Sequence, residues 1–386
     1  MRKVLLLGAS GSIGSQTLDI LLSDKAHFDL VGFSLGKRIE RVPDILSSFP
    51  SVKDVCVQRE EDYLSLKAKY PHLNWYFGDE GLKGIIDASD ADMVVNALVG
   101  FSGMVPSVES LRHNKVLCLA NKESLVVGGA LIRSLLKEGK GKLYPIDSEH
   151  VAIAKLLSRV NRDEVDKILI TASGGSFRDK SREELKEVTP AMALAHPTWS
   201  MGAKITIDSA TMMNKGFEVL EAKWLFDFPL ERTEILMHRE SHVHSVLLMK
   251  DGTYLADVSV PDMHGPIAYA LYETSVDFNL YPAKKLEDLG PYHFGKFDSE
   301  RYPAPGLAMK AFNMGGNATA VLNAANEEAV YSFLDGKIPF LAIEDVVRKA
   351  LDDIIITPSP NLDDLIMTDK QTREYVRRYV EERRSA

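Results

Sequence analysis

Carboxylates that could hold a metal ion lie in two short segments of the sequence. One segment is Asp147-Ser148-Glu149-His150, which follows a short predicted strand, and the other contains Glu218. In extended backbone Asp147 and Glu149 point the same way, and three carboxylates without cysteine suit Mg²⁺ or Mn²⁺. A second interpretation stays open, in which the first segment is a strand end with a helix N-cap. The sequence alone does not show that Glu218 joins the pair.

A glycine-rich turn near the N-terminus could hold the pyrophosphate of a dinucleotide. Between a predicted strand at 4–7 and a helical pattern over 12–22 lies the run Gly8-Ala9-Ser10-Gly11-Ser12-Ile13-Gly14. Glycines let backbone N–H groups approach a phosphate, and the dipole of the following helix favours its charge. The spacing is GxxGxxG rather than GxGxxG, so a purely structural turn is the alternative.

The end of the second predicted strand indicates which dinucleotide binds. Residues 33–38 read Phe-Ser-Leu-Gly-Lys-Arg, so the strand ends in two cations where an NAD enzyme usually places an acid. Cations suit a 2′-phosphate, which predicts NADP(H). A solvated basic turn is the competing interpretation.

Further polar clusters carry groups that suit a phosphate or a reacting carbonyl. Each cluster could instead have a purely structural role, as a helix start, a flexible turn or a packed histidine. The clusters are Asn121-Lys122-Glu123-Ser124, Ser173-Gly174-Gly175-Ser176, the loop 196–202 with His196, Trp199 and Met201, Asp208-Ser209-Ala210-Thr211, and Asn214-Lys215.

The elements that must position these residues indicate an α/β fold. Alternating strands and helices over 1–150 predict a Rossmann-like, doubly wound parallel sheet. Strands at 165–173, 234–249 and 252–260, the last two joined by a hairpin at Asp251-Gly252, predict an α+β catalytic and connective domain over 151–279. Residues 173–220 show little strand pattern and suggest lids or substrate loops. A linker is expected at 280–305, and a small helical domain at 306–386.

Composition excludes several partners. The 386 residues carry a net charge of −9, which disfavours nucleic acid and anionic membranes as partners. The two cysteines, Cys56 and Cys118, suit a reducing cytoplasm and argue against structural zinc. No apolar run reaches the length of a membrane span, and residues 4–7 are interpreted as a first strand rather than a signal peptide.

Together these segments resemble one family, the 1-deoxy-D-xylulose 5-phosphate reductoisomerases of non-mevalonate isoprenoid synthesis. The resemblance covers essentially the whole chain, and its motifs occur in one order. They are GASGSIG at 8–14, LANKESLV at 119–126, PIDSEH at 145–150, ASGGSF at 172–177, HPTWSMG at 196–202, KITIDSATMMNKGFE at 204–218, PDM at 261–263 and LNAANE at 322–327.

The resemblance implies a rearrangement of the ketose phosphate followed by reduction with NADPH, giving 2-C-methyl-D-erythritol 4-phosphate. It also implies Mg²⁺ or Mn²⁺, a homodimer joined through strands of the middle domain, and a flap at 195–203. The implied catalytic residues are Lys122 and the metal ligands Asp147, Glu149 and Glu218. The implied substrate residues are Lys122, Ser148, Glu149, Ser173, His196, Trp199, Met201, Ser209, Asn214, Lys215, Glu218 and Met263. The implied cofactor residues are Ser10, Gly11, Ser12, Ile13, Gly36, Lys37, Arg38, Asn121, Glu123 and Gly202.

Three positions depart from the family pattern. Arg38 replaces an asparagine, which is expected to strengthen the 2′-phosphate site. Ser176 replaces a proline, which is expected to loosen its turn. Ala203 replaces a basic residue.

Two rival functions remain. One is a plain NADP-dependent dehydrogenase acting on a small phosphorylated or amino-acid-derived aldehyde, and the other is a non-catalytic NADP(H)-binding regulator. Neither needs the acid triad together with the phosphate cluster.

Overall fold

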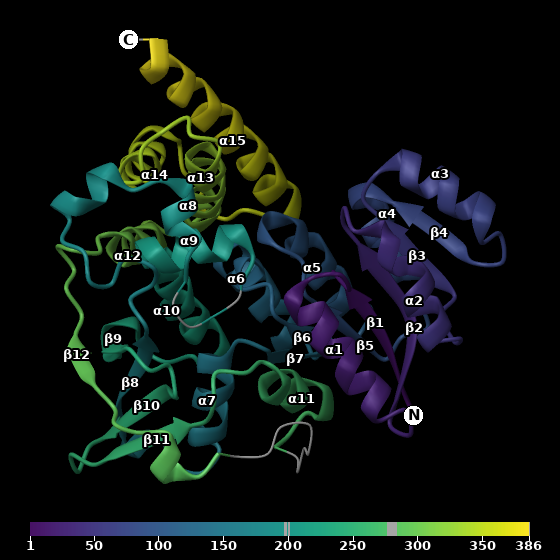
Figure 1. Ribbon diagram of the computed structural model, residues 1–386, viewed down its shortest axis with the longest axis horizontal. Helices are drawn as coiled ribbons and strands as arrows, with labels where there is room; N and C mark the ends of the chain where they lie inside the picture. Colours follow the sequence, from purple (N-terminus) through teal and green to yellow (C-terminus); the bar gives the residue numbers. More distant parts are fainter. Residues whose placement is uncertain (197–198, 200, 276–283, 386) are drawn as a thin grey trace. The chain divides into compact units, whose positions relative to one another are not determined.

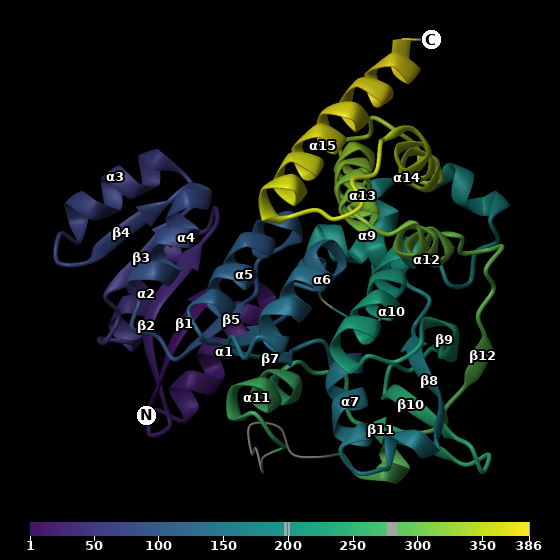
Figure 2. The ribbon, with the colours of Figure 1, turned by 180° about the vertical axis from the view of Figure 1, so that it is seen from behind.

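The computed structural model describes residues 1–196, 199, 201–275 and 284–385, and the chain divides into two compact units (Figure 1; Figure 2). The first unit comprises Met1–Ser124, Ala130–Asp147 and Asp262–Pro282. The second comprises Leu125–Gly129, Ser148–Pro261 and Ala283–Ala386. This division differs from the predicted boundaries, because the C-terminal helices share a unit with the middle of the chain.

A parallel seven-stranded sheet forms the centre of the first unit (Figure 1). Its order is β4-β3-β2-β1-β5-β6-β7, so the chain winds in one direction from β1 to β4 and in the other from β5 to β7. The predicted doubly wound sheet is confirmed, although the edge strand β4 was not among the predicted strands. The strands are β1 (Arg2–Leu7), β2 (Phe28–Leu35), β3 (Asp54–Val57), β4 (Asn74–Phe77), β5 (Met93–Asn96), β6 (Val116–Leu119) and β7 (Lys142–Pro145).

Helices cover both faces of this sheet, which explains the continuous apolar run in β1. Val4 and Leu6 pack into a core with α1, α2 and α11, whereas Leu5 and Leu7 pack against α4 on the other face. None of the helices in the described ranges is long and apolar enough to cross a membrane. The helices of this unit are α1 (Ser12–Ser23), α2 (Val42–Ser48), α3 (Glu60–Lys69), α4 (Gly78–Ala88), α5 (Met104–Arg112), most of α6 (Glu123–Lys137) and α11 (His264–Tyr272).

The helix α11 belongs to the first unit, although its residues were predicted to lie in the middle domain. Ile267 and Leu271 are buried in the core that contains β1. At the end of the helix Glu273 forms an ion pair with Arg2 at 2.5 Å and accepts a hydrogen bond from the Tyr144 hydroxyl at 2.8 Å. These long-range contacts could not be predicted from the local pattern.

The second unit contains a mixed sheet of order β11-β10-β8-β9-β12, in which only β8 and β9 pair in parallel. The single strand predicted at 234–249 is two strands, because the chain turns between His238 and Val243. The predicted hairpin at Asp251-Gly252 joins β10 to β11. The strands are β8 (Val165–Ala172), β9 (Thr233–His238), β10 (Val243–Met249), β11 (Tyr254–Val258) and β12 (Phe294–Lys296).

The helix α10 (Met213–Phe226) joins this sheet to the C-terminal helices (Figure 2). Val219 and Ala222 pack with α7 and the strands, whereas Phe217 and Leu220 pack into the core of the C-terminal helices. One helix therefore supplies both cores, which explains why the sheet and the helices form one unit. The other helices are α7 (Ser148–Leu157), α8 (Pro190–Ala193), α9 (Ala203–Thr211), α12 (Ala304–Met314), α13 (Ala318–Leu334), α14 (Ala342–Asp353) and α15 (Leu362–Ser385).

Two predicted loop segments contain regular structure. The segment 173–220, expected to form lids, contains α8, α9 and the first half of α10. The expected linker at 280–305 contains β12 and the start of α12, and its residues 280–283 lie outside the described part of the chain.

We predict that Gly14→Ala destabilises the first unit, because a Cβ there would lie 2.2 Å from the backbone oxygen of Gly8. Backbone atoms in a tight turn cannot move aside, so we expect a loss of about 1–3 kcal/mol in the free energy of unfolding. Gly265→Ala in α11 is the matched control, because a Cβ there meets nothing within 4 Å. Urea unfolding of both variants checks this, and equal stabilities would contradict it.

Candidate active site

The glycine turn brings the ends of β1 and β5 together at the point where the strand order reverses. Gly8 has a φ of +87°, and a Cβ on it would lie 2.6 Å from the Ala97 oxygen. Its N–H donates to the Ser34 hydroxyl at 2.9 Å, which ties the turn to β2. Ligands of doubly wound sheets bind at this switch point.

The start of α1 and the end of β2 share the same edge of the sheet. Gly11 is the extended N-cap of α1, so the first N–H groups of the helix, at Ser12 and Ile13, are available to an anion. Ser10 is buried in the turn. Gly36 follows β2, and Lys37 and Arg38 after it are both exposed. Because β1 and β2 are parallel neighbours, the anion-binding helix start and the two cations meet at one edge.

Asn121, predicted to bind the cofactor, has its side chain committed to the protein. Its Nδ2 donates to the carbonyl oxygens of Leu98 at 3.0 Å and Gly100 at 2.9 Å. Its Oδ1 accepts from the Ser124 N–H at 3.1 Å. The side chain therefore joins the loops after β5 and β6, and the Asn121 backbone N–H also donates within the protein, to the Asn96 oxygen at 3.2 Å. Glu123, also predicted to bind the cofactor, is the buried first residue of α6.

Lys122 and Asp147 form a buried ion pair at the ends of two neighbouring strands. Lys122 follows β6 and Asp147 follows β7, and only 7% and 11% of their side chains are exposed. Parallel pairing of β6 and β7 brings the two strand ends to the same edge. At this edge of the first unit, the Lys122 ammonium group therefore balances the charge of the Asp147 carboxylate.

Two further carboxylates meet around Lys215 in the second unit. The Lys215 Nζ lies 3.0 Å from Glu149 Oε1 and 2.5 Å from Glu218 Oε2. Oxygens of the two glutamates come within 4.8 Å of each other. Asn214 Nδ2 donates to the other oxygen of Glu218 at 2.5 Å. Glu149 and Glu218 were predicted as metal ligands and Asn214 and Lys215 as phosphate-binding residues, and the structure brings the four together.

The backbone at Glu149 differs from the prediction. The helix α7 begins at Ser148, so Glu149 lies in its first turn and not in extended backbone, and the alternative of a strand end before a helix is correct. The Ser148 hydroxyl donates to Glu149 Oε2 at 2.6 Å. Asp147 and Glu149 remain separated by one residue of the chain.

Three side chains that sequence reasoning did not assign support this group. His150, fully buried, binds the Glu218 backbone oxygen through Nε2 at 3.0 Å, and its Nδ1 lies 3.3 Å from Glu221. The Ser245 hydroxyl donates to the Glu149 carbonyl oxygen at 3.0 Å. His150 belongs to a motif already singled out, whereas Glu221 and Ser245 carry no local signal.

A second cluster contains two hydroxyls and an imidazole. The Nε2 atom of His196 lies 3.2 Å from the Ser209 hydroxyl and 3.5 Å from the Ser173 hydroxyl. The Trp199 N–H donates to His196 Nδ1 at 3.0 Å, so a neutral ring carries its proton on Nε2, facing the hydroxyls. Burial, followed by the Arg178 guanidinium, lowers the pKa of His196 below 6.5.

The turn after β8 aims the Ser173 hydroxyl. Gly174 and Gly175 have φ angles of +87° and +69°, and a Cβ on Gly175 would lie 2.6 Å from the Ser209 oxygen. Ser176, expected to loosen this turn, instead donates its hydroxyl to the Ala193 oxygen at 2.7 Å. The departure from proline is thus compensated by a hydrogen bond to α8.

The remaining predicted residues lie at helix starts or in the segment before α9. Gly202 is the extended N-cap of α9, and both Gly202 and Ala203 are exposed. Met201 is half-buried. Met263, predicted to line the substrate pocket, is the N-cap of α11 in the first unit. Pro197, Thr198 and Ser200 of the predicted flap lie outside the described residues.

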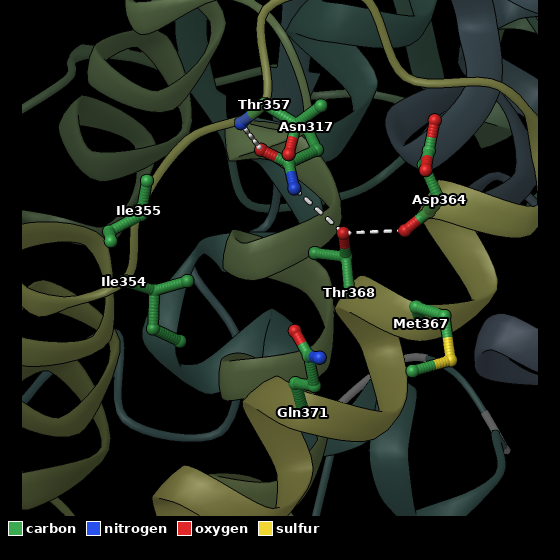
Figure 3. A pocket seen from close by; sticks show the side chains of 8 residues that line it. All are labelled: Asn317, Ile354, Ile355, Thr357, Asp364, Met367, Thr368 and Gln371. Carbon is green, nitrogen blue, oxygen red and sulfur yellow. Dashed lines mark hydrogen bonds between the residues drawn. The ribbon is translucent and has the colours of Figure 1, made fainter.

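A cavity of about 240 Å³ lies among the C-terminal helices (Figure 3). Its polar lining is internally bonded, since Asn317 Nδ2 donates to the Thr368 hydroxyl at 2.7 Å. It contains none of the predicted catalytic groups. The lining residues are Asn317, Ile354, Ile355, Thr357, Asp364, Met367, Thr368 and Gln371.

A glycine turn at the switch point of a doubly wound sheet, with carboxylates on strand and helix ends, defines a dinucleotide-dependent α/β oxidoreductase. Three family models match the chain, and all describe one enzyme. "1-Deoxy-D-xylulose 5-phosphate reductoisomerase" matches residues 4–129, and its two C-terminal domain models match 143–226 and 258–375. The chain belongs to the 1-deoxy-D-xylulose 5-phosphate reductoisomerase family, which confirms the resemblance noted in the sequence.

Relatives and solved structures agree with this membership. Reductoisomerases of this name from Listeria innocua and a Geobacillus strain are 43% and 45% identical, over 98% of this chain and 99% of each relative. The Zymomonas mobilis enzyme in complex with NADPH has a TM-score of 0.89 at 37% identity, covering 98% of this chain and 99% of its own. A reductoisomerase in complex with NADPH, fosmidomycin and magnesium has a TM-score of 0.92 at 34% identity, covering 99% and 98%.

We predict that the stability of the second unit falls in acid partly because of His196. Its pKa is lowered in the folded state, so below about pH 6.5 the unfolded chain binds a proton that the folded chain does not. The free energy of unfolding should therefore fall as the pH drops, and His196→Gln should flatten that slope. Urea unfolding across a pH series checks this, with His72→Gln at an exposed histidine as the control. An unchanged slope in His196→Gln would contradict the prediction.

Proposed function

We infer that this protein converts 1-deoxy-D-xylulose 5-phosphate into 2-C-methyl-D-erythritol 4-phosphate, using NADPH and a divalent metal ion. Family membership supports the reaction. The observation that carries it is the pair of carboxylates, Glu149 and Glu218, gathered around Lys215. A plain dehydrogenase of a small aldehyde has no use for such a pair. One structure of a related enzyme contains NADPH, fosmidomycin and magnesium, and another contains NADPH.

We propose that Asp147, Glu149 and Glu218 hold Mg²⁺ or Mn²⁺. All are oxygen donors, as these hard cations prefer, and Asp147 stands two positions before Glu149 in the chain. When bound, such an ion stabilises the negative charge that develops on substrate oxygens during rearrangement and reduction. Lys122, paired with Asp147, then serves as a proton relay or as a fixed positive charge beside the reacting carbons.

The phosphate of the substrate is proposed to bind at the second cluster of the same unit. The Ser173 and Ser209 hydroxyls and the Nε2–H of His196 face one another there. Asn214 and Lys215 add an amide and an ammonium group from the first turn of α10. Lys215 can exchange its carboxylate partners for a phosphate oxygen, which couples phosphate binding to the carboxylate pair.

NADPH is proposed to bind at the edge of the first unit, with its pyrophosphate at the start of α1. The backbone N–H groups at 10–13 and the helix dipole suit the pyrophosphate. Lys37 and Arg38 suit the 2′-phosphate, because both are exposed cations after β2. Gly36, Asn121, Glu123 and Gly202 complete the predicted cofactor set.

Three broader expectations remain predictions. The homodimer has support in β11, an edge strand on which Tyr254, Leu255 and Val258 are all exposed. The flap at 195–203 has support in Trp199, whose N–H binds the ring of His196. The cytoplasmic location rests on the two buried, free cysteines.

The experiment that tests the function compares substrates by NADPH absorbance. We expect rapid oxidation of NADPH with 1-deoxy-D-xylulose 5-phosphate in the presence of Mg²⁺ or Mn²⁺, and a product that mass spectrometry identifies as the branched polyol phosphate. Faster oxidation with a small aldehyde such as a semialdehyde would favour the plain dehydrogenase. NADPH binding without any turnover would favour the regulator.

We predict that Glu218→Gln lowers kcat by about 10³-fold or more, because losing a ligand removes several kcal/mol of stabilisation by the metal. The amide keeps the size of the side chain, so the variant should fold and bind NADPH with unchanged affinity. Glu234→Gln is the matched control, since Glu234 forms an exposed ion pair with Lys167 at 2.6 Å in the same unit. Steady-state kinetics that leave Glu218→Gln as active as Glu234→Gln would contradict the metal assignment.

We predict that Lys37→Ala and Arg38→Ala each raise the KM for NADPH by about tenfold, the value of one hydrogen bond to a charged group. The KM for NADH should stay unchanged, because NADH lacks the 2′-phosphate. Lys83→Ala, an exposed cation on α4, serves as the control. An equal rise for both cofactors would show that these cations do not contact the 2′-phosphate.

A further inference from the structure

Buried polar side chains join α9 to α13 outside the proposed active site. Asp208 of α9 and Asn326 of α13 are 1% and 0% exposed. The Asn326 Nδ2 donates to Asp208 Oδ1 at 2.8 Å. Lys204, one turn earlier on α9 and also buried, places its Nζ 2.7 Å from Asp208 Oδ2. A charge pair and an amide thus form one small network inside the helical core.

Packing alone does not explain this network. The residues around it on the same helices, including Ile207, Ala210 and Ala325, are fully buried and apolar. Burying a charge pair costs desolvation free energy that an apolar side chain of similar volume would not cost. A hydrogen bond is directional, however, and apolar contacts are not, so the network specifies one arrangement of α9 against α13.

The helix that this network fixes carries a residue of the proposed phosphate site. Ser209 follows Asp208 directly on α9, and its hydroxyl lies 3.2 Å from His196 Nε2. The Ser209 carbonyl also faces Gly175, where a Cβ would lie 2.6 Å away. A small shift of Asp208 therefore moves the Ser209 hydroxyl and the adjoining turn together. Displacements of about 1 Å at such groups are enough to weaken a binding site.

We propose that Asn326, acting through Asp208, is a positioning residue for the Ser209 hydroxyl. The C-terminal helix α13 thereby sets the affinity of the protein for the phosphate of its substrate, although Asn326 contacts no reacting group. This inference rests on the proposed function. It also gives a role to the motif LNAANE at 322–327, to which the sequence analysis assigned no function.

The test is a comparison of Asn326→Leu with Asn317→Leu. Both changes remove a buried amide of the second unit that bridges α13 to another helix, since Asn317 Nδ2 donates to the Thr368 hydroxyl at 2.7 Å. Both should lower the thermal midpoint. Only Asn326→Leu should raise the KM for 1-deoxy-D-xylulose 5-phosphate, by about tenfold, with kcat within about threefold of wild type and the KM for NADPH unchanged.

A second pair of variants keeps the proposal testable if Asn326→Leu does not fold. Asn326→Asp sets a carboxylate against Asp208, so it should raise the KM for the sugar phosphate. Adding Asp208→Asn restores an amide–carboxylate hydrogen bond in the reversed direction and keeps one carboxylate in the network to balance Lys204, so it should lower that KM again. A double variant no better than Asn326→Asp would count against the proposal.

The outcomes separate this inference from the proposed function. If wild-type protein turns over the sugar phosphate but Asn326→Leu has a wild-type KM, the inference alone fails. It also fails if Asn317→Leu raises the KM equally, because a general loss of stability would then explain the effect. If wild-type protein does not oxidise NADPH with this substrate, the proposed function fails and the inference falls with it.

Discussion

The site depends on the balance of charge between carboxylates that are close together and partly buried and the lysines beside them. Carboxylate oxygens of Glu149 and Glu218 lie within 4.8 Å of each other, and the two negative charges repel. A nearby cation is needed to offset this repulsion. Lys215 supplies that cation in the second unit, and Lys122 does the same for Asp147 in the first. Each lysine is itself buried, so its charge requires at least one neighbouring carboxylate. A site that must hold concentrated negative charge is suited to a divalent ion.

The fold delivers these groups through element ends and one shared helix. Asp147 and Lys122 come from the ends of neighbouring parallel strands, where a doubly wound sheet presents its ligands. Asn214, Lys215 and Glu218 lie on α10, whose other faces pack against the sheet and against the C-terminal helices. Because α10 packs into both cores, the position of its site residues depends on the packing of the whole second unit. The network of Asp208 and Asn326 extends the same principle to α9.

The sequence predicted the elements whose pattern is local. Val4–Leu7 is a continuous apolar run before glycines, and its strand and turn were predicted correctly. The family motifs predicted that Glu149 acts with Glu218 and that Ser173 acts with Ser209 and His196. The ion pair of Lys215 with both glutamates was not predicted. Placement that depends on distant partners was not predictable. The helix α11 joins the first unit through Glu273 and Arg2, and Asn121 turns its amide to the loops after β5 and β6.

Other failures have equally physical causes. Glu149 was expected in extended backbone, but a serine and an acid after a strand are also a helix start, and α7 begins there. The edge strand β4 was not predicted although Trp75, Tyr76 and Phe77 favour a strand, and only its pairing with β3 establishes it. The polar support from Glu221 and Ser245 has no local signal in the sequence because each acts across the fold. Asn326 lies in the motif LNAANE, but its partner Asp208 is 118 positions away in the chain.

The central claim is that the acids around Lys215 bind a divalent cation, and direct metal binding tests it without reference to turnover. We would titrate Mn²⁺ into chelator-stripped protein and follow free Mn²⁺ by electron paramagnetic resonance, for wild type and for Glu218→Gln. The account predicts saturable binding of one Mn²⁺ per chain in wild type, displaced by Mg²⁺ and strongly weakened in Glu218→Gln. Equal binding by both proteins, or no saturable binding in wild type, would contradict it.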